Sequence, residues 1–450
     1  MTTLAARSLT LCGRELPALM VGGMGTNIST AAMALAVERT GGIAHLSDAM
    51  LMDVCDRVFG TRFTAAKAKA CRAWRDAATK LEEAFDLEAV RAATLKYVGD
   101  VMERASGRGL VLINCMEKLT MNAGLESLKT RLNAALDAGV GGITLSAGLH
   151  LSSFRLMAEN PRFRDAALGV VVSSARALNL FLKKSAPTGR LPDYVVVEGP
   201  LAGGHLGFGM DWAKHSLEAI VREVKDFVAN EVVAKGGAKI PVLAAGGVFT
   251  GGDAVRMVEE AGADGIQAAT RFAVTEESGL TDAAKQAFFN ARPEDIEVNA
   301  LSPTGYPMRM LKSSPAIGSG IRPNCEAYGY LLNKGECSYL KEWQARQAAI
   351  ASGETPPAPV KECLCTHMRN YKVWTTGAMA WRLRETSVQR ADGTWILPKA
   401  EEVYADYLHS SGSEIRLPAA AVAYLRSVGR DRPQAAGGAL EEPGRRLAGS

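Results

Sequence analysis

A histidine on a glycine-rich loop is the strongest candidate for a catalytic group. The segment Val195-Val-Val-Glu198-Gly-Pro-Leu-Ala-Gly-Gly-His205 starts as an apolar strand and runs through glycines before it reaches the imidazole. Glycines let a backbone approach a planar ring system closely, and an imidazole with a pKa near neutrality can remove a proton from a carbon acid or donate one to a product. A histidine that only hydrogen-bonds its own loop is the commoner case, but the position after a strand favours catalysis by His205.

Two neighbouring glycine-bearing segments predict a phosphate site. The segment 241–248 is typical of a buried strand that opens into two glycines, and the segment 250–253 then starts a helix with its free N–H groups directed outward. The next unit, 262–272, adds Ala269 and Thr270. Backbone amides and a helix N-terminus neutralise anions, and the loops after the seventh and eighth strands of an α/β barrel commonly do so. Tight turns alone would also explain the glycines, but the pairing of two such loops favours a phosphate.

The elements that would position these residues are repeated βα units. Short apolar or β-branched runs recur along the chain, each followed by an alanine-rich stretch with helical spacing. Most lack strict alternation, as expected for parallel strands covered on both faces. Eight such runs without a reversal favour a closed TIM (β/α)8 barrel over a doubly wound open sheet. The predicted strands are 18–22, 42–45, 110–114, 142–146, 168–173, 194–197, 241–245 and 264–268.

Helices are expected between these strands, and several close on Ala-Gly, where glycine supplies a left-handed cap. The predicted helices are 30–39, 125–138, 174–184, 211–234, 252–260 and 276–290. The barrel is expected over residues 1–310, with a helical insertion at about 48–108. A C-terminal extension over 311–429 is expected to pack on the barrel. The Pro/Gly/Arg-rich tail 430–450 is expected to be disordered.

Composition excludes several function classes. The chain has 450 residues, of which 47% are hydrophobic and 22% charged, so it can bury a sizeable core. Its net charge of +4 comes from 52 basic and 48 acidic side chains without a long basic block, which argues against a nucleic-acid partner. No apolar run approaches the roughly 18 to 20 residues that span a bilayer, and the N-terminal segment lacks a signal-peptide pattern. A cytoplasmic protein is expected, with a small-molecule substrate and no membrane partner, and a homodimer is left open.

Four cysteines late in the chain are weak metal-ligand candidates. Cys325, Cys337, Cys363 and Cys365 lie close to His367 and could supply thiolates to an iron–sulfur cluster or zinc. Their spacing is irregular and contains no C-x-x-C, so unligated cysteines are favoured. If a metal is bound, a structural clamp for the C-terminal region is its simplest role.

The sequence resembles the nitronate monooxygenase family, formerly called 2-nitropropane dioxygenases, and the related FMN-containing enoyl-acyl-carrier-protein reductases. The resemblance runs from about Pro17 to about Met310, and the order and spacing of its matches carry it. The matches are Pro17-Ala-Leu-Met-Val-Gly-Gly-Met-Gly25, Gly41-Gly42, Ala202-Gly-Gly-His205, Ala245-Gly-Gly247 with Gly265-Ile-Gln-Ala-Ala-Thr-Arg-Phe272, and Ser302-Pro-Thr-Gly-Tyr-Pro-Met-Arg309.

The resemblance implies an FMN site with His205 as base or polar anchor. The family often has glycine where this chain has Ala268 or Ala269, which puts the amide geometry there in doubt. The residues implied around the cofactor are Gly22, Gly23 and Met24 along the flavin ring, Asn114 hydrogen-bonding it, Glu198, Gly203 and Gly204 on its other side, Gly246, Gly247, Ala269 and Thr270 at the phosphate, and Gln267 in the same unit.

Several functions compete. The leading one is a nitronate monooxygenase-type enzyme that oxidises a small carbon acid with O2. The runner-up is an NAD(P)H-dependent enoyl-thioester reductase, for which the insertion and the C-terminal extension could form an acyl-carrier-protein docking surface. A flavin-free sugar-phosphate isomerase or aldolase would share the phosphate loops, but no predicted strand ends in the lysine that a Schiff base needs. A non-catalytic flavin-binding protein would not explain His205 on its glycine loop.

Overall fold

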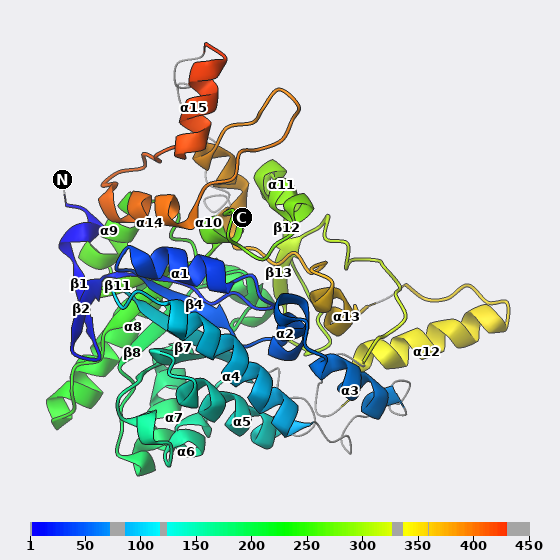
Figure 1. Cartoon of the computed structure of the whole chain (residues 1–450), viewed down its shortest axis with the longest axis horizontal. Helices are drawn as coiled ribbons and strands as arrows, with labels where there is room; N and C mark the ends of the chain where they lie inside the picture. The colour runs from blue at the N-terminus through cyan, green and yellow to red at the C-terminus, as the bar shows by residue number, and fades with distance from the viewer. Residues whose placement is uncertain (1, 73–85, 118–123, 326–335, 359, 430–450) are drawn as a thin grey trace, which may run out of the picture.

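The computed structural model describes residues 2–72, 86–117, 124–325, 336–358 and 360–429 (Figure 1). The predicted tail 430–450 lies outside the described residues. Among those residues, no helix is both long and apolar enough to cross a bilayer.

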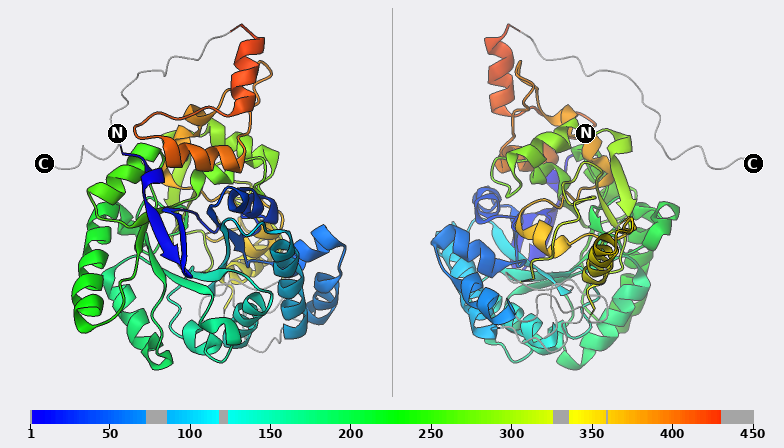
Figure 2. Two further views of the ribbon diagram at one scale, coloured as in Figure 1. Left: turned by 60° about the vertical axis from the view of Figure 1, so that its left-hand side comes forward. Right: turned by 90° about the vertical axis from the view of Figure 1, so that its right-hand side faces the viewer.

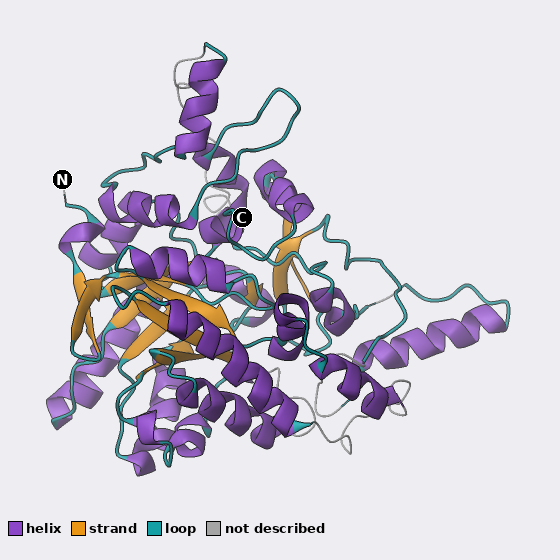
Figure 3. Cartoon of the chain, in the orientation of Figure 1, coloured by secondary structure: helices purple, strands orange, loops and turns teal. Residues whose placement is uncertain are grey.

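Eight parallel strands form a closed barrel in the order β3-β4-β5-β6-β7-β8-β10-β11, with β11 paired back to β3. Figure 3 draws the strands in orange, with helices around them. The closure confirms the predicted TIM barrel and excludes the open sheet. Every predicted strand is present, because short apolar runs between glycine-bearing turns are typical of buried parallel strands. The strands are β3 (Leu19–Val21), β4 (Ile43–Ser47), β5 (Leu110–Met116), β6 (Gly142–Ser146), β7 (Ala167–Val172), β8 (Tyr194–Glu198), β10 (Val242–Ala245) and β11 (Gly265–Ala268).

A ring of helices surrounds the barrel, and side-chain caps set where most of them begin. Thr30, Ser174 and Ser216 each accept a hydrogen bond from the backbone N–H three residues later. These helices are α1 (Ala31–Arg39), α4 (Leu87–Arg104), α5 (Gly124–Asp137), α6 (Ser153–Met157), α7 (Ala175–Ser185), α8 (Leu217–Phe227) and α9 (Gly251–Glu259).

Two predicted helices are partly wrong. The prediction over 211–234 is broken by Ser216, whose extended backbone and side-chain cap restart the helix at Leu217, and the chain after α8 continues as a π turn and a 3-10 turn. The prediction over 276–290 holds only for α11 (Asp282–Asn290), because Thr281 is extended and caps that helix. The helical periodicity of the sequence continues across Ser216 and Thr281, but the side-chain caps at these two residues decide where each helix begins.

The ring is completed from beyond residue 310. Helix α14 (Ala400–His409) packs against α1 and α9 (Figures 1 and 2). Its Tyr404 hydroxyl donates a 2.9 Å hydrogen bond to the Leu19 carbonyl of β3, and its Tyr407 hydroxyl donates to the Val248 carbonyl at 3.1 Å. Because both tyrosines belong to the main hydrophobic core, the C-terminal region supplies an integral helix of the barrel and does not merely pack on it.

The expected helical insertion between β4 and β5 lies only partly outside the ring of helices. It contains α2 (Leu51–Phe59), α3 (Phe63–Cys71) and α4, of which α4 packs against α1 and α5 within the ring. Among the described residues of the insertion, α2 and α3 therefore form the excursion from the barrel.

Two smaller antiparallel sheets lie outside the barrel. A hairpin of β1 (Ser8–Leu11) and β2 (Arg14–Pro17) precedes the barrel, while β9 (Gly204–His205), β12 (Ile296–Asn299) and β13 (Met308–Leu311) form a separate antiparallel sheet. Among the described residues, further α-helices are α10 (Thr270–Ala273), α12 (Ser338–Ala351), α13 (Leu364–Arg369) and α15 (Ala419–Ser427), and a 3-10 helix spans Ala378–Thr386.

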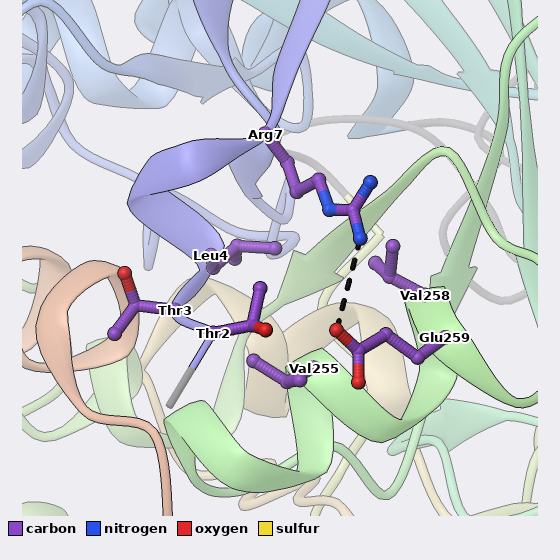
Figure 4. A pocket seen from close by; sticks show the side chains of 7 residues that line it. All are labelled: Thr2, Thr3, Leu4, Arg7, Val255, Val258 and Glu259. Atoms are coloured by element: carbon purple, nitrogen blue, oxygen red, sulfur yellow. Dashed lines mark ion pairs between the residues drawn. The ribbon is translucent and has the colours of Figure 1, made fainter.

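The N-terminal segment packs on the outer wall of the barrel. Arg7 forms a 3.7 Å ion pair with Glu259 of α9, across a shallow hollow that contains none of the predicted site residues (Figure 4). This hollow is lined by Thr2, Thr3, Leu4, Arg7, Val255, Val258 and Glu259.

Candidate active site

The strand register brings predicted cofactor residues to one rim of the barrel. Ala245 at the end of β10 lies opposite Glu198 of β8 on one side and Gln267 of β11 on the other. The Gly22 amide, just after β3, donates a 2.7 Å hydrogen bond to the Ala268 carbonyl. Glu198, Gln267 and Gly22 therefore follow one another around the C-terminal edge of the barrel, where barrel enzymes build their sites.

The turn after β3 has no room for a side chain at Gly23 and little room at Gly22. A Cβ atom at Gly23 would lie 2.1 Å from the Asn114 Cβ, and one at Gly22 would lie 3.3 Å from the Ala269 Cβ. The contact with Asn114 joins the ends of β3 and β5, two elements that the sequence placed on the same cofactor. Met24 follows directly, and its amide donates to the Ser29 hydroxyl at 2.9 Å.

A buried ion pair that the sequence did not single out holds the end of β5. Asp48 and Arg131 form this pair, with their side chains 1% and 7% exposed. Asp48 also accepts from the Met116 amide at 3.2 Å and donates its own amide to the Asn114 carbonyl at 3.2 Å. The backbone that carries Asn114 is thereby fixed from the end of β4.

His205 lies on β9, beside a strand from far along the chain. Its Nε2 is 2.7 Å from the hydroxyl of Ser302, which is fully buried and lies 2.7 Å from the hydroxyl of Thr304. Met308 of β13 pairs with His205, and the Leu206 amide donates to the Pro307 carbonyl. The sequence match at 302–309 carried no assigned role, and the structure shows that this segment orients the imidazole.

Arg309 clamps the loop that leads to His205. Its Nη1 donates to the carbonyls of Pro200 at 2.7 Å and Ala202 at 2.5 Å, and its guanidinium lies 4.4 Å from the centre of the Trp212 ring. Burial lowers the pKa of Arg309 to about 10, so the group stays charged at neutral pH. Among the described residues its Nη2 has no hydrogen-bond partner.

Glu198 is a second proton-holding group at this rim. Burial raises the pKa of its carboxyl from 4.5 to about 7, because the charged form loses hydration at the end of β8. Its strand leads directly into the loop of His205. The site therefore has a carboxyl that changes its protonation near neutral pH.

The two predicted phosphate loops follow neighbouring strands, because Ala245 of β10 pairs with Gln267 of β11. Gly246 and Gly247 have φ angles of +92° and +95°, and a Cβ at Gly246 would lie 2.9 Å from the Ala202 amide nitrogen. The glycines are therefore required by the turn and by the close approach of the His205 loop.

The expectation of free amides at the start of α9 is wrong for four of the amides there. The amides of Phe249 and Thr250 donate to the Asp253 carboxylate, the Asp253 amide donates to the Thr250 hydroxyl, and the Gly252 amide donates to the Gly412 carbonyl. A capping box and the C-terminal region thus satisfy these groups, so a phosphate would have to use the loops at Gly246–Gly247 and at Ala269–Thr270.

Two buried polar atoms at the rim have no hydrogen-bond partner among the described residues: the Gln267 Oε1 and the Thr376 Oγ1. Gln267 lies against the Gly22 position, and Thr376 lies against the Gly203 backbone. Buried polar groups in native proteins are normally paired, so these atoms point to a polar ligand. FMN fits this arrangement, since its ring edge, ribityl hydroxyls and phosphate all form hydrogen bonds.

The other histidines have structural roles. His45 lies inside the barrel with Nδ1 2.6 Å from the Val21 carbonyl, and burial lowers its pKa to about 4. His150 is held between Ser153 and the Ser146 carbonyl, at 2.7 Å from each. His215 is exposed and contacts the Phe208 ring.

The late cysteines form local contacts. Cys363 donates to the Thr366 hydroxyl at 3.1 Å, and burial raises the pKa of its thiol. Cys337 accepts from the Leu340 amide at the start of α12. Within the part of the chain that the structure describes, no three Cys, His, Asp or Glu side chains gather as a metal site, and neither Cys325 nor Cys365 belongs to one.

The comparison with known families decides the assignment. Residues 14–316 match the family model described as nitronate monooxygenase, a span that includes all eight barrel strands, His205 and Ser302. The chain belongs to the nitronate monooxygenase family. Membership confirms the resemblance found in the sequence.

Individual relatives of this family are distant. A probable nitronate monooxygenase of Staphylococcus haemolyticus is 32% identical over 111 residues, which cover 24% of this chain and 28% of that protein. The (3aS,4S,5R,7aS)-5-hydroxy-7a-methyl-1-oxo-octahydro-1H-indene-4-carboxyl-CoA dehydrogenase of Mycobacterium tuberculosis is 30% identical over 190 residues, or 40% of this chain and 48% of that protein. The chain thus matches less than half of the length of either curated relative.

A solved structure extends the likeness in fold. The structure of FabK from Thermotoga maritima aligns with a TM-score of 0.52 and 16% identity, covering 95% of this chain and 99% of that one. The alignment includes the C-terminal region that supplies α14, so the shared barrel fold continues past residue 316.

Proposed function

We propose that the protein is an FMN-dependent oxidoreductase that oxidises a small carbon acid, such as an alkyl nitronate, with O2 as the electron acceptor. The observation that carries this proposal is the placement of His205. Its imidazole is hydrogen-bonded to buried Ser302 on the loop that follows β8, the strand that ends at the same rim as the Gly23–Asn114 contact. A fixed imidazole at a flavin site is suited to holding or moving a proton at a carbon acid.

Each residue at the rim has a role in this proposal. When bound, FMN supplies the electron-accepting chemistry that side chains lack. His205 binds the nitronate anion or takes the α-proton of the neutral carbon acid, and Ser302 keeps the ring in one orientation. Glu198 holds or releases a second proton near neutral pH. The flavin is held by Gly22, Gly23, Met24, Asn114, Gly203, Gly204 and Gln267, and its phosphate by Gly246, Gly247, Ala269 and Thr270.

A second candidate is NAD(P)H-dependent reduction of an enoyl thioester, with acyl carrier protein as a partner. It is supported by the Mycobacterium tuberculosis relative, whose name describes a dehydrogenase of a CoA thioester. A flavin-free sugar-phosphate barrel is disfavoured, because none of the eight barrel strands ends in a lysine for a Schiff base.

The test starts with the visible spectrum of the purified protein after FMN addition and removal of free flavin. Retained flavin absorbance supports the proposal, and its absence would contradict the cofactor assignment. The flavin-loaded protein is then mixed anaerobically with propane-2-nitronate, NADH or NADPH. Bleaching by the nitronate and reoxidation by O2 are expected, whereas bleaching by NAD(P)H alone would favour the second candidate.

The variant His205→Asn separates chemistry from cofactor binding. We expect it to retain FMN and to lower kcat by roughly 100- to 10,000-fold, the usual contribution of a general acid or base. Unchanged turnover would remove His205 from the mechanism.

A further inference from the structure

A short segment of the C-terminal region crosses the barrel rim next to His205. The Thr376 amide donates to the Arg309 carbonyl at 3.3 Å, the Ala378 amide donates to the Leu201 carbonyl at 3.0 Å, and Thr375 forms a β-bridge with Met310. The segment 374–378 thus continues the small sheet of β9 and β13 onto the loop that carries Gly203. It lies beyond residues 14–316, which the family model covers.

The segment fills the space between two predicted parts of the flavin site. A Cβ at Gly203 would lie 2.5 Å from the Thr376 carbonyl carbon and 2.6 Å from the Gly377 nitrogen. A Cβ at Gly377 would lie 2.6 Å from the Thr270 hydroxyl oxygen. Thr376 and Gly377 are therefore packed between Gly203 and Thr270, with no room for a side chain at either glycine.

The hydroxyl of Thr376 has no hydrogen-bond partner among the described residues, although the residue is only 5% exposed. Its neighbour in the strand, Thr375, is more exposed and contributes a backbone bridge. Consecutive strand residues point to opposite faces, so the two hydroxyls face different surroundings. A buried hydroxyl without a partner is costly, and a ligand at the rim would satisfy it.

We propose that the Thr376 hydroxyl donates a hydrogen bond to the phosphate of FMN, so that Thr376, from the C-terminal region, completes the cofactor site. The phosphate is the assigned group because Gly377 contacts Thr270, a residue of the phosphate loop. This inference rests on the proposed function, since it requires FMN at the rim. It adds a binding residue from outside the matched family domain.

The test compares two flavins that differ only in the phosphate. Dissociation constants of FMN and riboflavin are measured by fluorescence quenching for the wild-type apoprotein and for Thr376→Val, which removes the hydroxyl and keeps the shape. The variant is expected to bind FMN about 10- to 100-fold more weakly, the scale of a hydrogen bond to a charged group, and to bind riboflavin as the wild type does. Thr375→Val is the matched control and is expected to change neither constant.

Other outcomes overturn the inference. Equal weakening of both flavins, or no change in either, would show that Thr376 does not contact the phosphate. If Thr376→Val does not fold, Thr376→Ser and Thr376→Ala replace it. FMN affinity retained in the serine variant and lost in the alanine variant supports the contact, and equal affinities contradict it. If the wild-type protein binds neither flavin, the proposed function itself fails.

Discussion

The Ser302 hydroxyl lies 2.7 Å from Nε2 of His205, although 97 residues separate the two in the chain. Ser302 is fully buried and also contacts the Thr304 hydroxyl, so its position is set by the loop before β13 and not by His205. The imidazole is therefore oriented by a rigid partner, as a proton-transferring group requires.

We predict that Ser302→Ala lowers kcat by about 10-fold or more while FMN binding is unchanged, because the ring loses its fixed orientation but the cofactor contacts remain. Steady-state kinetics and an FMN titration measure these two quantities. Ser185→Ala on α7 is the control, because it removes another buried serine hydroxyl far from the site. A matching loss of kcat in both variants would refute a positioning role for Ser302.

The second prediction concerns the contact between the phosphate loop and α14. Arg271 follows Thr270 and forms a 2.8 Å ion pair with Asp406, with both side chains 2% exposed. Asp406→Asn should destabilise the apoprotein by about 3 to 5 kcal/mol, because it leaves the buried guanidinium uncompensated. FMN affinity should fall as well, since Arg271 fixes the end of that loop. Urea unfolding and FMN titration test the two effects.

The control for this prediction is an exposed ion pair. Arg7 and Glu259 are 3.7 Å apart with side chains about half exposed, so Glu259→Gln should change stability by no more than about 1 kcal/mol. Equal effects of the two substitutions would mean that the Arg271–Asp406 pair does not stabilise the barrel.

The barrel could be predicted from the sequence because each of its strands is encoded by a short, contiguous run of residues. Each apolar run ends in a turn residue, and eight such runs in series allow few other folds. The eighth helix could not be assigned in this way, because α14 begins at Ala400, more than a hundred residues after β11. Nothing in its local pattern says which strand it will cover, and only the tertiary contacts of Tyr404 and Tyr407 decide it.

The candidate site likewise contains residues that the sequence could reveal and residues that it could not. Glycines and His205 were visible as motifs, since close backbone approach demands particular residue types. Ser302, Arg309 and Thr376 were not assigned roles, because each acts through a contact with a segment remote in sequence. The free amides expected at the start of α9 were wrong because the Asp253 side chain and Gly412 bind them.

The third prediction tests the packing of the turn after β3. Gly23→Ala would place a methyl group 2.1 Å from the Asn114 Cβ, so the turn or Asn114 must move. We expect a loss of about 1 to 3 kcal/mol in the stability of the apoprotein and weaker FMN binding. Gly99→Ala in α4 is the control: no atom lies within 4 Å of the added Cβ, and alanine should stabilise the helix by about 0.5 to 1 kcal/mol. Unchanged FMN binding in Gly23→Ala would place the flavin elsewhere.

The fourth prediction follows from the raised pKa of Glu198. Between pH 4.5 and about 7 the folded protein keeps a proton on this carboxyl that the unfolded chain releases. The favourable contribution is therefore present at low pH and is lost as the pH rises through 7, by up to about 3 kcal/mol. Glu198→Gln cannot ionise, so the variant should gain stability relative to the wild-type apoprotein as the pH is raised from 5 to 8. Urea unfolding at both values measures the difference.

Glu38 provides a control of opposite sign. Burial acts to raise the pKa of Glu38, but hydrogen bonds from Ser106 and Gly109 outweigh it and leave the pKa below its usual value. The carboxylate of Glu38 therefore stabilises the fold above its unfolded pKa, and this contribution is lost as the pH falls through the folded value. Glu38→Gln should be less stable than the wild type at pH 8, and this difference in stability should be smaller at low pH. If Glu198→Gln shows the same trend as Glu38→Gln, the Glu198 carboxyl is ionised at neutral pH and cannot serve as a proton donor beside the flavin.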